Sequence, residues 1–244
     1  LNVLNAGFFT HQNIKGKIFI AGSDGKIITL DNEGSQWLAA DTPGFNDKIT
    51  ALAANNTGIE LVAVGENGLI AHSNDSGKHW HKRPSPSQKT ITTISFDENY
   101  QRWIAAGEQG LILISDAIGY NWQQVEFAST STFSKIVSLP DRIIAIGDNG
   151  LIAQSTDGGL DWDIIPAVST ATLIDIAVTD TNILISGADG NLLRGNLETN
   201  LWEIVTTGFS TYLSRIFYNS EQKILLSLSS DGDIFLSDDG GNLW

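Results

Sequence analysis

The chain has 244 residues, of which 41% are apolar, and its formal net charge at pH 7 is −14. This acidity argues against nucleic acid as a partner, because no part of the sequence forms the basic stripe that neutralises phosphates. No apolar run is long enough to cross a membrane, so direct membrane insertion is not expected either. The absence of cysteine excludes disulfides, thiolate metal sites and thiol nucleophiles.

A sequence unit of about forty residues occurs six times along the chain. Each copy contains an apolar run, a tight turn that ends in Gly, a second apolar run, a polar turn and a Trp. The gap from the turn Gly to the Trp is always twelve residues, whereas successive Trp residues are 43, 42, 40, 40 and 42 apart. A constant gap inside a variable period indicates repeats with a fixed core and variable connecting loops. The Gly and Trp pairs are Gly25/Trp37, Gly68/Trp80, Gly110/Trp122, Gly150/Trp162, Gly190/Trp202 and Gly232/Trp244.

Local sequence chemistry predicts that these units are built from β-strands. Residues 61–64 and 143–146 are short, rich in β-branched side chains, and followed by a Gly-x-x-Gly turn. Five turns supply the two positive-φ residues of a two-residue type I′ hairpin, and only Gln109-Gly110 departs from that chemistry. The five turns are Asp24-Gly25, Asn67-Gly68, Asn149-Gly150, Asp189-Gly190 and Asp231-Gly232.

Each unit is predicted to contain four strands, named a to d in chain order. In the second unit, strand a covers about residues 49–54, strand b 61–65, strand c 69–73 and strand d 79–82. Four-stranded antiparallel sheets repeated around an axis form an all-β β-propeller, which we expect as a single domain over residues 1–244. The expected blades cover about residues 1–43, 44–86, 87–128, 129–168, 169–207 and 208–244.

The two ends of the sequence carry expectations of their own. The chain contains no Met and ends at Trp244, where strand d of the sixth unit begins. We therefore expect a processed chain or a segment of a longer one or of a complex, with the missing strand supplied by further sequence or another segment. Six blades are visible and seven are possible. A cysteine-free repeat protein suits secretion, so we expect a periplasmic, secreted or surface location.

The polar turn between strands c and d follows a motif in three of the six units. All three copies fit Ser-x-Asp-x-Gly-x-x-Trp. The Asp carboxylate can accept backbone N–H groups within its own turn, Gly takes the strained dihedral angle, and Trp anchors the hairpin by packing. Residues 30–37, 115–122 and 195–202 are degraded copies. The complete copies contain Ser73, Asp75, Gly77 and Trp80; Ser155, Asp157, Gly159 and Trp162; and Ser237, Asp239, Gly241 and Trp244.

This motif resembles the Asp-box, or BNR repeat. The units are most similar to the YCF48-like propellers, because strand b ends in Gly65-Glu-Asn-Gly68 and Gly107-Glu-Gln-Gly110 before the Asp-box follows. The resemblance covers nearly the whole chain. It implies a non-catalytic role in binding or assembly, with the Asp-boxes acting only as structural elements.

One face of the propeller is the expected binding surface. The b–c turns and d–a loops emerge together, and each b–c turn contains one acidic residue. As a set these residues form a rim that attracts a basic partner, although acidic residues are also common in solvated turns. Aromatic residues in the d–a loops either anchor a partner or pack between blades. The acidic residues are Asp24, Glu66, Glu108, Asp148, Asp189 and Asp231, and the aromatic residues are Phe45, Phe133, Phe209 and Tyr212.

Two further groups of residues are candidates for a site. Aligning the inner strands places Ala51, Thr93, Ser138, Asp175 and Arg215 at one equivalent position, so Asp175 and Arg215 on neighbouring blades either form an ion pair or line the base of a pocket. A hairpin between strands c and d of the second unit would place His72 opposite His79, with His81 on the same face. Three imidazoles on one face can bind zinc. The alternative is a polar blade edge with no metal.

The sequence favours a binding module for a protein partner, without a cofactor, over two alternatives. The first is a carbohydrate- or receptor-binding propeller domain of a larger surface or virion adhesin. The second is a sialidase-like glycosidase, since Asp-boxes occur there too. Sialidase chemistry requires clustered arginines, but Arg102 and Arg142 fall toward the opposite face and only Arg215 is well placed. We therefore expect no enzymatic activity.

Overall fold

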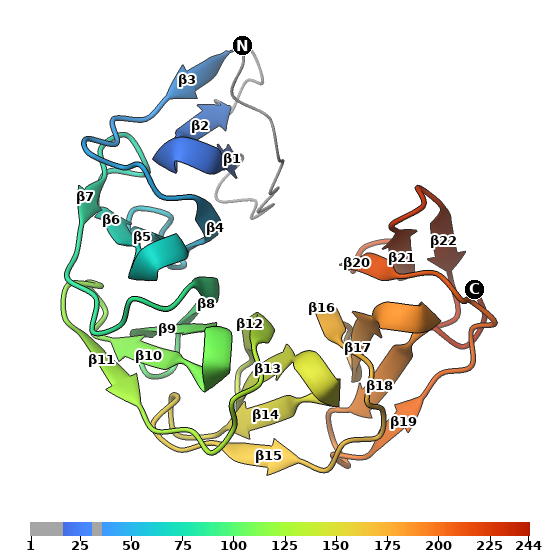
Figure 1. The fold of residues 1–244 in the computed structure, drawn as a ribbon. Coiled ribbons are helices and arrows are strands. Elements are labelled where there is room, and N and C mark those ends of the chain that lie inside the picture. The colour runs from blue at the N-terminus through green and yellow to red at the C-terminus, as the bar shows by residue number, and fades with distance from the viewer. Residues whose placement is uncertain (1–16, 31–35) are drawn as a thin grey trace. The chain divides into compact units, whose positions relative to one another are not determined.

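The computed structural model describes residues 17–30 and 36–244. Within these residues the chain forms six antiparallel sheets of three or four strands, connected in simple up-and-down order (Figure 1). The first three sheets contain β1 (Ile18–Ala21), β2 (Ile27–Leu30) and β3 (Trp37–Ala39); β4 (Ile49–Ala54), β5 (Leu61–Gly65), β6 (Ile70–Ser73) and β7 (His81–Lys82); and β8 (Ile91–Asp97), β9 (Arg102–Gly107), β10 (Ile112–Ser115) and β11 (Trp122–Val125).

The remaining three sheets repeat the same plan. They contain β12 (Phe133–Ser138), β13 (Ile143–Gly147), β14 (Ile152–Ser155) and β15 (Asp163–Ile165); β16 (Leu173–Val178), β17 (Asn182–Gly187), β18 (Leu192–Asn196) and β19 (Trp202–Ile204); and β20 (Leu213–Asn219), β21 (Ile224–Ser229) and β22 (Ile234–Ser237). The predicted strands a, b and c of the second unit match β4, β5 and β6 closely. Strand d is shorter than predicted, since β7 contains only His81 and Lys82. Phe8 and Phe9, which the repeat pattern places in the inner strand region of the first repeat, lie outside the described residues.

The chain divides into two compact units. The first contains Leu1–Ile144 and Ser155–Trp162, and the second contains Ala145–Gln154 and Asp163–Trp244. Among the described residues, no helix is long and apolar enough to span a membrane.

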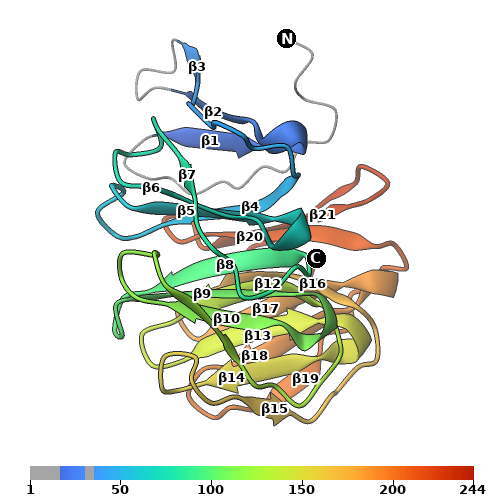
Figure 2. The same cartoon turned by 60° about the vertical axis from the view of Figure 1, so that its left-hand side comes forward.

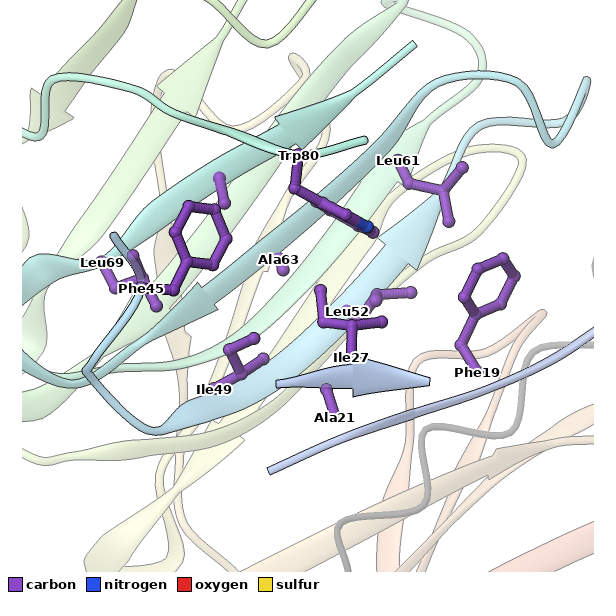
Figure 3. Packing of buried hydrophobic residues seen from close by; sticks show 11 residues of the cluster. Phe19, Ala21, Ile27, Phe45, Ile49, Leu52, Leu61, Ala63, Leu69 and Trp80 are labelled. Atoms are coloured by element: carbon purple, nitrogen blue, oxygen red, sulfur yellow. The ribbon is translucent and has the colours of Figure 1, made fainter. Parts of the chain in front are cut away.

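In the first compact unit, the sheets β1–β3, β4–β7 and β8–β11 follow one another as layers (Figure 2). The buried side chains form clusters shared by successive sheets. Sheet β4–β7 uses both faces. Leu61, Ala63 and Trp80 pack toward β1–β3 (Figure 3), whereas Val62 and Val64 pack toward β8–β11. This explains why strand b is a continuous apolar run: every one of its residues is buried.

The second compact unit, which contains Ala145–Gln154 and Asp163–Trp244, is built in the same way. Ala177, Leu184 and Leu192 of sheet β16–β19 share one buried cluster with Ile216 and Leu225 of sheet β20–β22. Since each sheet contributes alternate side chains to its two faces, neighbouring repeats stabilise one another.

Candidate functional site

The three complete Asp-boxes fold into one hydrogen-bonded turn. In residues 73–80, the Ser73 hydroxyl donates to Asp75 Oδ1 at 2.9 Å and accepts the N–H of Gly77 at 3.0 Å. Asp75 Oδ1 also accepts the N–H groups of Lys78 and His79, both at 3.0 Å. The Trp80 indole N–H donates to the Gly77 carbonyl at 3.0 Å. The turn therefore satisfies most of its own backbone donors, while the N–H groups of Ser76 and Trp80 donate to the carbonyl groups of Ile59 at 3.1 Å and Asp41 at 2.9 Å.

The same bonds recur in the other two complete copies. Ser155 donates to Asp157 at 2.8 Å, and Ser237 donates to Asp239 at 2.8 Å. Each carboxylate also accepts two backbone N–H groups three and four residues later. The Asp-box is thus a local structural device in this chain.

These contacts lower the pKa values of the three Asp carboxyl groups. Burial raises the pKa of Asp75, but hydrogen bonds from the His79 ring, the Ser73 hydroxyl and two backbone N–H groups outweigh it and bring the pKa to about 2. Burial also opposes the hydrogen bonds to Asp157, and the N–H groups of Asp161 and Leu160 with the Ser155 hydroxyl lower its pKa. The Leu243 N–H and the Ser237 hydroxyl lower the pKa of Asp239.

The Asp-box turns also pack on the sheet that precedes them. A Cβ added to Gly77 would lie 2.4 Å from the Phe19 ring, and one added to Gly241 would lie 2.7 Å from the Leu184 side chain. Gly77 has a φ of +83°, so neither the backbone conformation nor the space permits a side chain. Gly therefore serves the contact between sheets as well as the turn.

Two degraded copies replace the missing Asp in different ways. In residues 115–122 the residue at the Asp position is Ala117, and Asp116 accepts the N–H groups of Gly119 and Tyr120 instead. Sequence alignment by position missed this substitution. In residues 195–202, Asn196 Oδ1 accepts the N–H groups of Glu198 and Thr199. The degraded copy at residues 30–37 lies partly outside the described residues.

Five of the six b–c turns are the short 3-10 turns η1 to η5. As predicted, they combine two residues with positive φ, for example 54° at Asn67 and 68° at Gly68. The prediction was wrong at one position, Asp231. Gln109-Gly110 adopts the same conformation, with φ of 53° and 70°, whereas Asp231 is not among the positive-φ residues and only Gly232 has φ of 94°. The turns are η1 (Ser23–Gly25), η2 (Glu66–Gly68), η3 (Glu108–Gly110), η4 (Asp148–Gly150) and η5 (Ala188–Gly190).

Backbone hydrogen bonds hold these turns against their own strand a and the following loop. The N–H of Glu66 donates to the Lys48 carbonyl at 3.0 Å, and the N–H of Ala188 donates to the Thr172 carbonyl at 2.9 Å. The N–H of Gly110 donates to Ser131 at 2.9 Å, which joins the turn to the next d–a loop. The b–c turns and d–a loops therefore meet on one side of each unit, as expected.

The six acidic residues occupy two different positions in these turns. Glu66, Glu108 and Asp148 come first, while Asp24, Asp189 and Asp231 precede the Gly. Glu108 and Asp148 are half-buried, because Glu108 accepts the Thr90 N–H at 3.3 Å and Asp148 accepts the Thr172 hydroxyl at 3.3 Å. The other four side chains are exposed: Asp24, Glu66, Asp189 and Asp231.

The four aromatic residues of the d–a loops do not share one environment. Phe45 and Phe133 are only 5% and 0% exposed, so they cannot serve as exposed anchors. Phe45 packs in the core beside Leu69, and Phe133 is the first residue of an inner strand. Tyr212 is 42% exposed, and Phe209 is half-buried with its ring stacked on Phe235 at 3.8 Å. A role in binding remains a prediction for Tyr212 and Phe209.

The inner-strand alignment was correct for four positions and wrong for one. A β-bulge follows the first residue of strand a, so the register shifts between Ile49 and Ala51, and likewise before Thr93, Asp175 and Arg215. Counting from Phe133 in the same way, the equivalent residue of the fourth sheet is Lys135 and not Ser138.

Thr93 and Asp175 bond to the backbone of the following sheet. The Thr93 hydroxyl accepts the N–H of Ile136 at 3.0 Å, and Asp175 accepts the N–H of Ile216 at 3.2 Å. Both side chains are buried. Asp175 therefore bonds to the residue that follows Arg215 in the chain. The Arg215 guanidinium donates to the Ser214 carbonyl at 2.8 Å. This geometry supports a structural role for Asp175.

The three histidines do not gather as predicted. His72 pairs in register with His81, not with His79, because the chain at His79 and Trp80 still belongs to the turn. His72 lies 2.5 Å from Glu60, whereas the exposed His79 lies 2.5 Å from Asp75. Over residues 17–30 and 36–244, no group of three His, Asp or Glu side chains is arranged to hold a metal ion.

Comparison with known proteins agrees with this geometry. Residues 51–167, slightly less than half of the chain, match the family model of the photosynthesis system II assembly factor YCF48. Over this stretch the chain is similar to the YCF48 family of Asp-box propellers. No curated protein matches its sequence.

Solved structures share the propeller fold at low sequence identity. The structure of YCF48 bound to a D1 peptide aligns with a TM-score of 0.74 and 16% identity, over 93% of this chain and 77% of that one. YCF48 from Cyanidioschyzon merolae aligns with a TM-score of 0.68 and 15% identity, over 91% and 76% of the two chains. The GH74 enzyme of Niastella koreensis aligns with a TM-score of 0.83 and 16% identity. That match covers 98% of this chain but only 45% of the enzyme.

Arg102 and Arg142 lie away from the b–c turns, as expected. Arg102 donates to the Gly158 carbonyl in an Asp-box turn at 3.3 Å, and Arg142 pairs with Asp141 at 2.6 Å in an a–b turn. Arg142 also lines a cavity of about 200 Å³ together with Asp97 and Tyr100. Both arginines therefore lie on the side of the a–b turns and not on the proposed binding face.

A second cavity of about 320 Å³ lies at the degraded hairpin of the fifth repeat. Arg194 lines it and donates to Glu203 at 3.3 Å. No residue of this cavity was predicted from the sequence. The signal that could have found it is the loss of the Ser and Asp of the Asp-box between Gly195 and Trp202.

Proposed function

We propose that this protein is a non-catalytic binding module that holds a protein partner through its b–c turns and d–a loops. The observation that carries the proposal is the rigidity of the b–c turns. Their backbone is held by hydrogen bonds to strand a and to the next loop, while their carboxylates at Asp24, Glu66, Asp189 and Asp231 stay exposed. A preorganised polar surface loses little conformational entropy when a partner binds.

Two further considerations support a protein as the partner. The family model is named for an assembly factor, and one YCF48 structure was solved with a D1 peptide. An acidic surface favours partners with basic segments and raises their rate of association. The GH74 enzymes share the fold alone, so they do not favour catalysis here.

The test is a quantitative affinity capture from native extract with matched variants. In the first variant, Asp24, Asp189 and Asp231 become Asn and Glu66 becomes Gln. Asn tolerates the left-handed conformation that Asp24 and Asp189 adopt, so the turns are retained. The control variant changes the same number of exposed carboxylates in the a–b turns: Glu98, Asp141, Asp180 and Glu221.

We expect the first variant to capture at least about tenfold less of a specific partner protein than the wild type does. The control variant should capture as much of it as the wild type. The capture by wild-type protein should also weaken as salt is raised. Equal capture by the wild type and the first variant would reject the proposed face. An extracytoplasmic location stays a prediction, which cell fractionation would check.

A further inference from the structure

A buried histidine fastens one Asp-box hairpin to the preceding sheet. His72 lies in β6, is 1% exposed, and its Nε2 is 2.5 Å from Oε2 of Glu60. Its other ring nitrogen, Nδ1, is buried and has no hydrogen-bond partner. The imidazole is therefore hydrogen-bonded on one side and enclosed by protein on the other.

Tyr120 connects this histidine to the hairpin of residues 115–122. The rings of His72 and Tyr120 meet edge to face, with centroids 5.0 Å apart and an interplanar angle of 80°. The Arg83 guanidinium lies over the Tyr120 ring at 3.7 Å. Tyr120 therefore holds its hairpin between a side chain of β6 and a residue that follows β7.

Four charged or titratable groups face His72. They are Glu60 before β5, His81 on β7, Arg83 after β7, and Tyr120. Burial is the largest effect and lowers the pKa of His72; Glu60 opposes it, and the nearby Arg83 and His81 lower it further. Protonation would place a hydrogen on the buried Nδ1, where no acceptor exists.

We propose that Glu60, His72, Arg83 and Tyr120 form a pH-sensitive latch, closed while His72 is neutral and loosened in mildly acidic solution, which controls how firmly the hairpin of residues 115–122 is held. This goes beyond partner binding, because it assigns a conformational device to a hairpin between strands c and d, away from the b–c turns of the proposed binding face.

The direction of the pH effect follows from linkage. The pKa of His72 in the closed latch lies below its ordinary value of 6.5. An opened latch therefore binds more protons than a closed one once the pH falls below that value. The stability of the latch is fully present above the ordinary pKa of histidine and is lost as the pH falls from there toward the lowered pKa.

Hydrogen exchange of the Tyr120 and Trp122 amides, expressed as protection factors, measures the latch directly. Between about pH 7.5 and about pH 5.5 we expect a loss of protection of about tenfold in the wild type. The hairpin of residues 155–162 is the internal reference, because Asp157 organises it and no histidine fastens it. If the ratio of the protection factors of the two hairpins stays constant with pH, the proposal is overturned.

Two variants assign the effect to His72. Gln154 occupies the position equivalent to His72 in β14, so His72→Gln should be accommodated, and it should abolish the pH dependence at Tyr120. Glu60→Gln removes the opposing carboxylate, so it should deepen the acid-induced loss. His81→Gln is the control and should retain the effect. If His72→Gln keeps the wild-type pH dependence, the latch is not built on His72.

Discussion

The two sets of turns in each repeat use the same residue types in opposite ways. In the complete Asp-boxes, Asp75 and its equivalents accept hydrogen bonds from their own turns. In the b–c turns the backbone is fixed by carbonyl groups of strand a and the next loop, and exposed carboxylates such as Glu66 have no such task. Residue type alone therefore does not separate a structural carboxylate from one available to a partner; its hydrogen bonds do.

The largest expected effect is on the hairpin that carries the Asp-box. Trp80 is fully buried in the cluster between the first two sheets. Trp80→Ala should lower the free energy of unfolding by about 3–5 kcal/mol, because it removes a large buried side chain and leaves a cavity. Chemical denaturation measures this loss. If the loss of unfolding free energy is as small as that expected from substituting an exposed side chain, Trp80 contributes little to the core.

A smaller loss is expected from an Asp-box carboxylate. Asp157→Ala leaves two backbone N–H groups and the Ser155 hydroxyl without their acceptor, which should cost about 1–3 kcal/mol of unfolding free energy. The matched b–c variant, Glu66→Ala, should stay within about 0.5 kcal/mol of the wild type. Similar losses for both variants would remove the distinction between the two sets of turns.

Acid stability sharpens the same distinction. The pKa values of Asp75, Asp157 and Asp239 lie below the ordinary 3.8, and that of Asp75 is about 2. Their stabilisation is present above the ordinary pKa and is lost as the pH falls toward about 2, because the unfolded chain takes up protons first. Changing all three residues to Asn should flatten the dependence of the denaturation midpoint on pH in this range. An unchanged slope would contradict the assignment.

The smallest effect tests the degraded third copy. Ser115 Oγ is buried without a hydrogen-bond partner, because Ala117 stands where the complete boxes have Asp. Ala117→Asp should supply the acceptor and raise the free energy of unfolding by about 0.5–1 kcal/mol. A loss of stability would indicate that Asp116 already satisfies this turn and that a second carboxylate is unfavourable there.

The sequence predicted the repeat well because the repeat depends on local chemistry. The type I′ turns follow from Asn-Gly and Asp-Gly pairs, and the apolar b strands follow from sheets buried on both faces. Gln109 adopts the left-handed conformation because the surrounding backbone bonds are the same as in the other turns. In the fourth repeat, the position equivalent to Thr93 and Asp175 is Lys135 and not Ser138.

The candidate site was predictable in position but not in exposure. The acidic residues and the d–a loops do meet on one side of each unit, yet Phe45 and Phe133 are buried while Tyr212 is exposed. An aromatic residue in a loop can face either way, and packing against distant residues decides which. The His72 latch escaped prediction for the same reason, since Tyr120 reaches it from the next repeat.

The most direct test measures stability and partner capture together in two variants. One is Asp157→Asn, and the other is the variant with amides at Asp24, Glu66, Asp189 and Asp231. We predict that Asp157→Asn is less stable and keeps the captured partner, while the second variant is as stable as the wild type and loses the partner. The opposite pattern, with capture lost in Asp157→Asn and retained in the second variant, would contradict the division between structural and binding carboxylates.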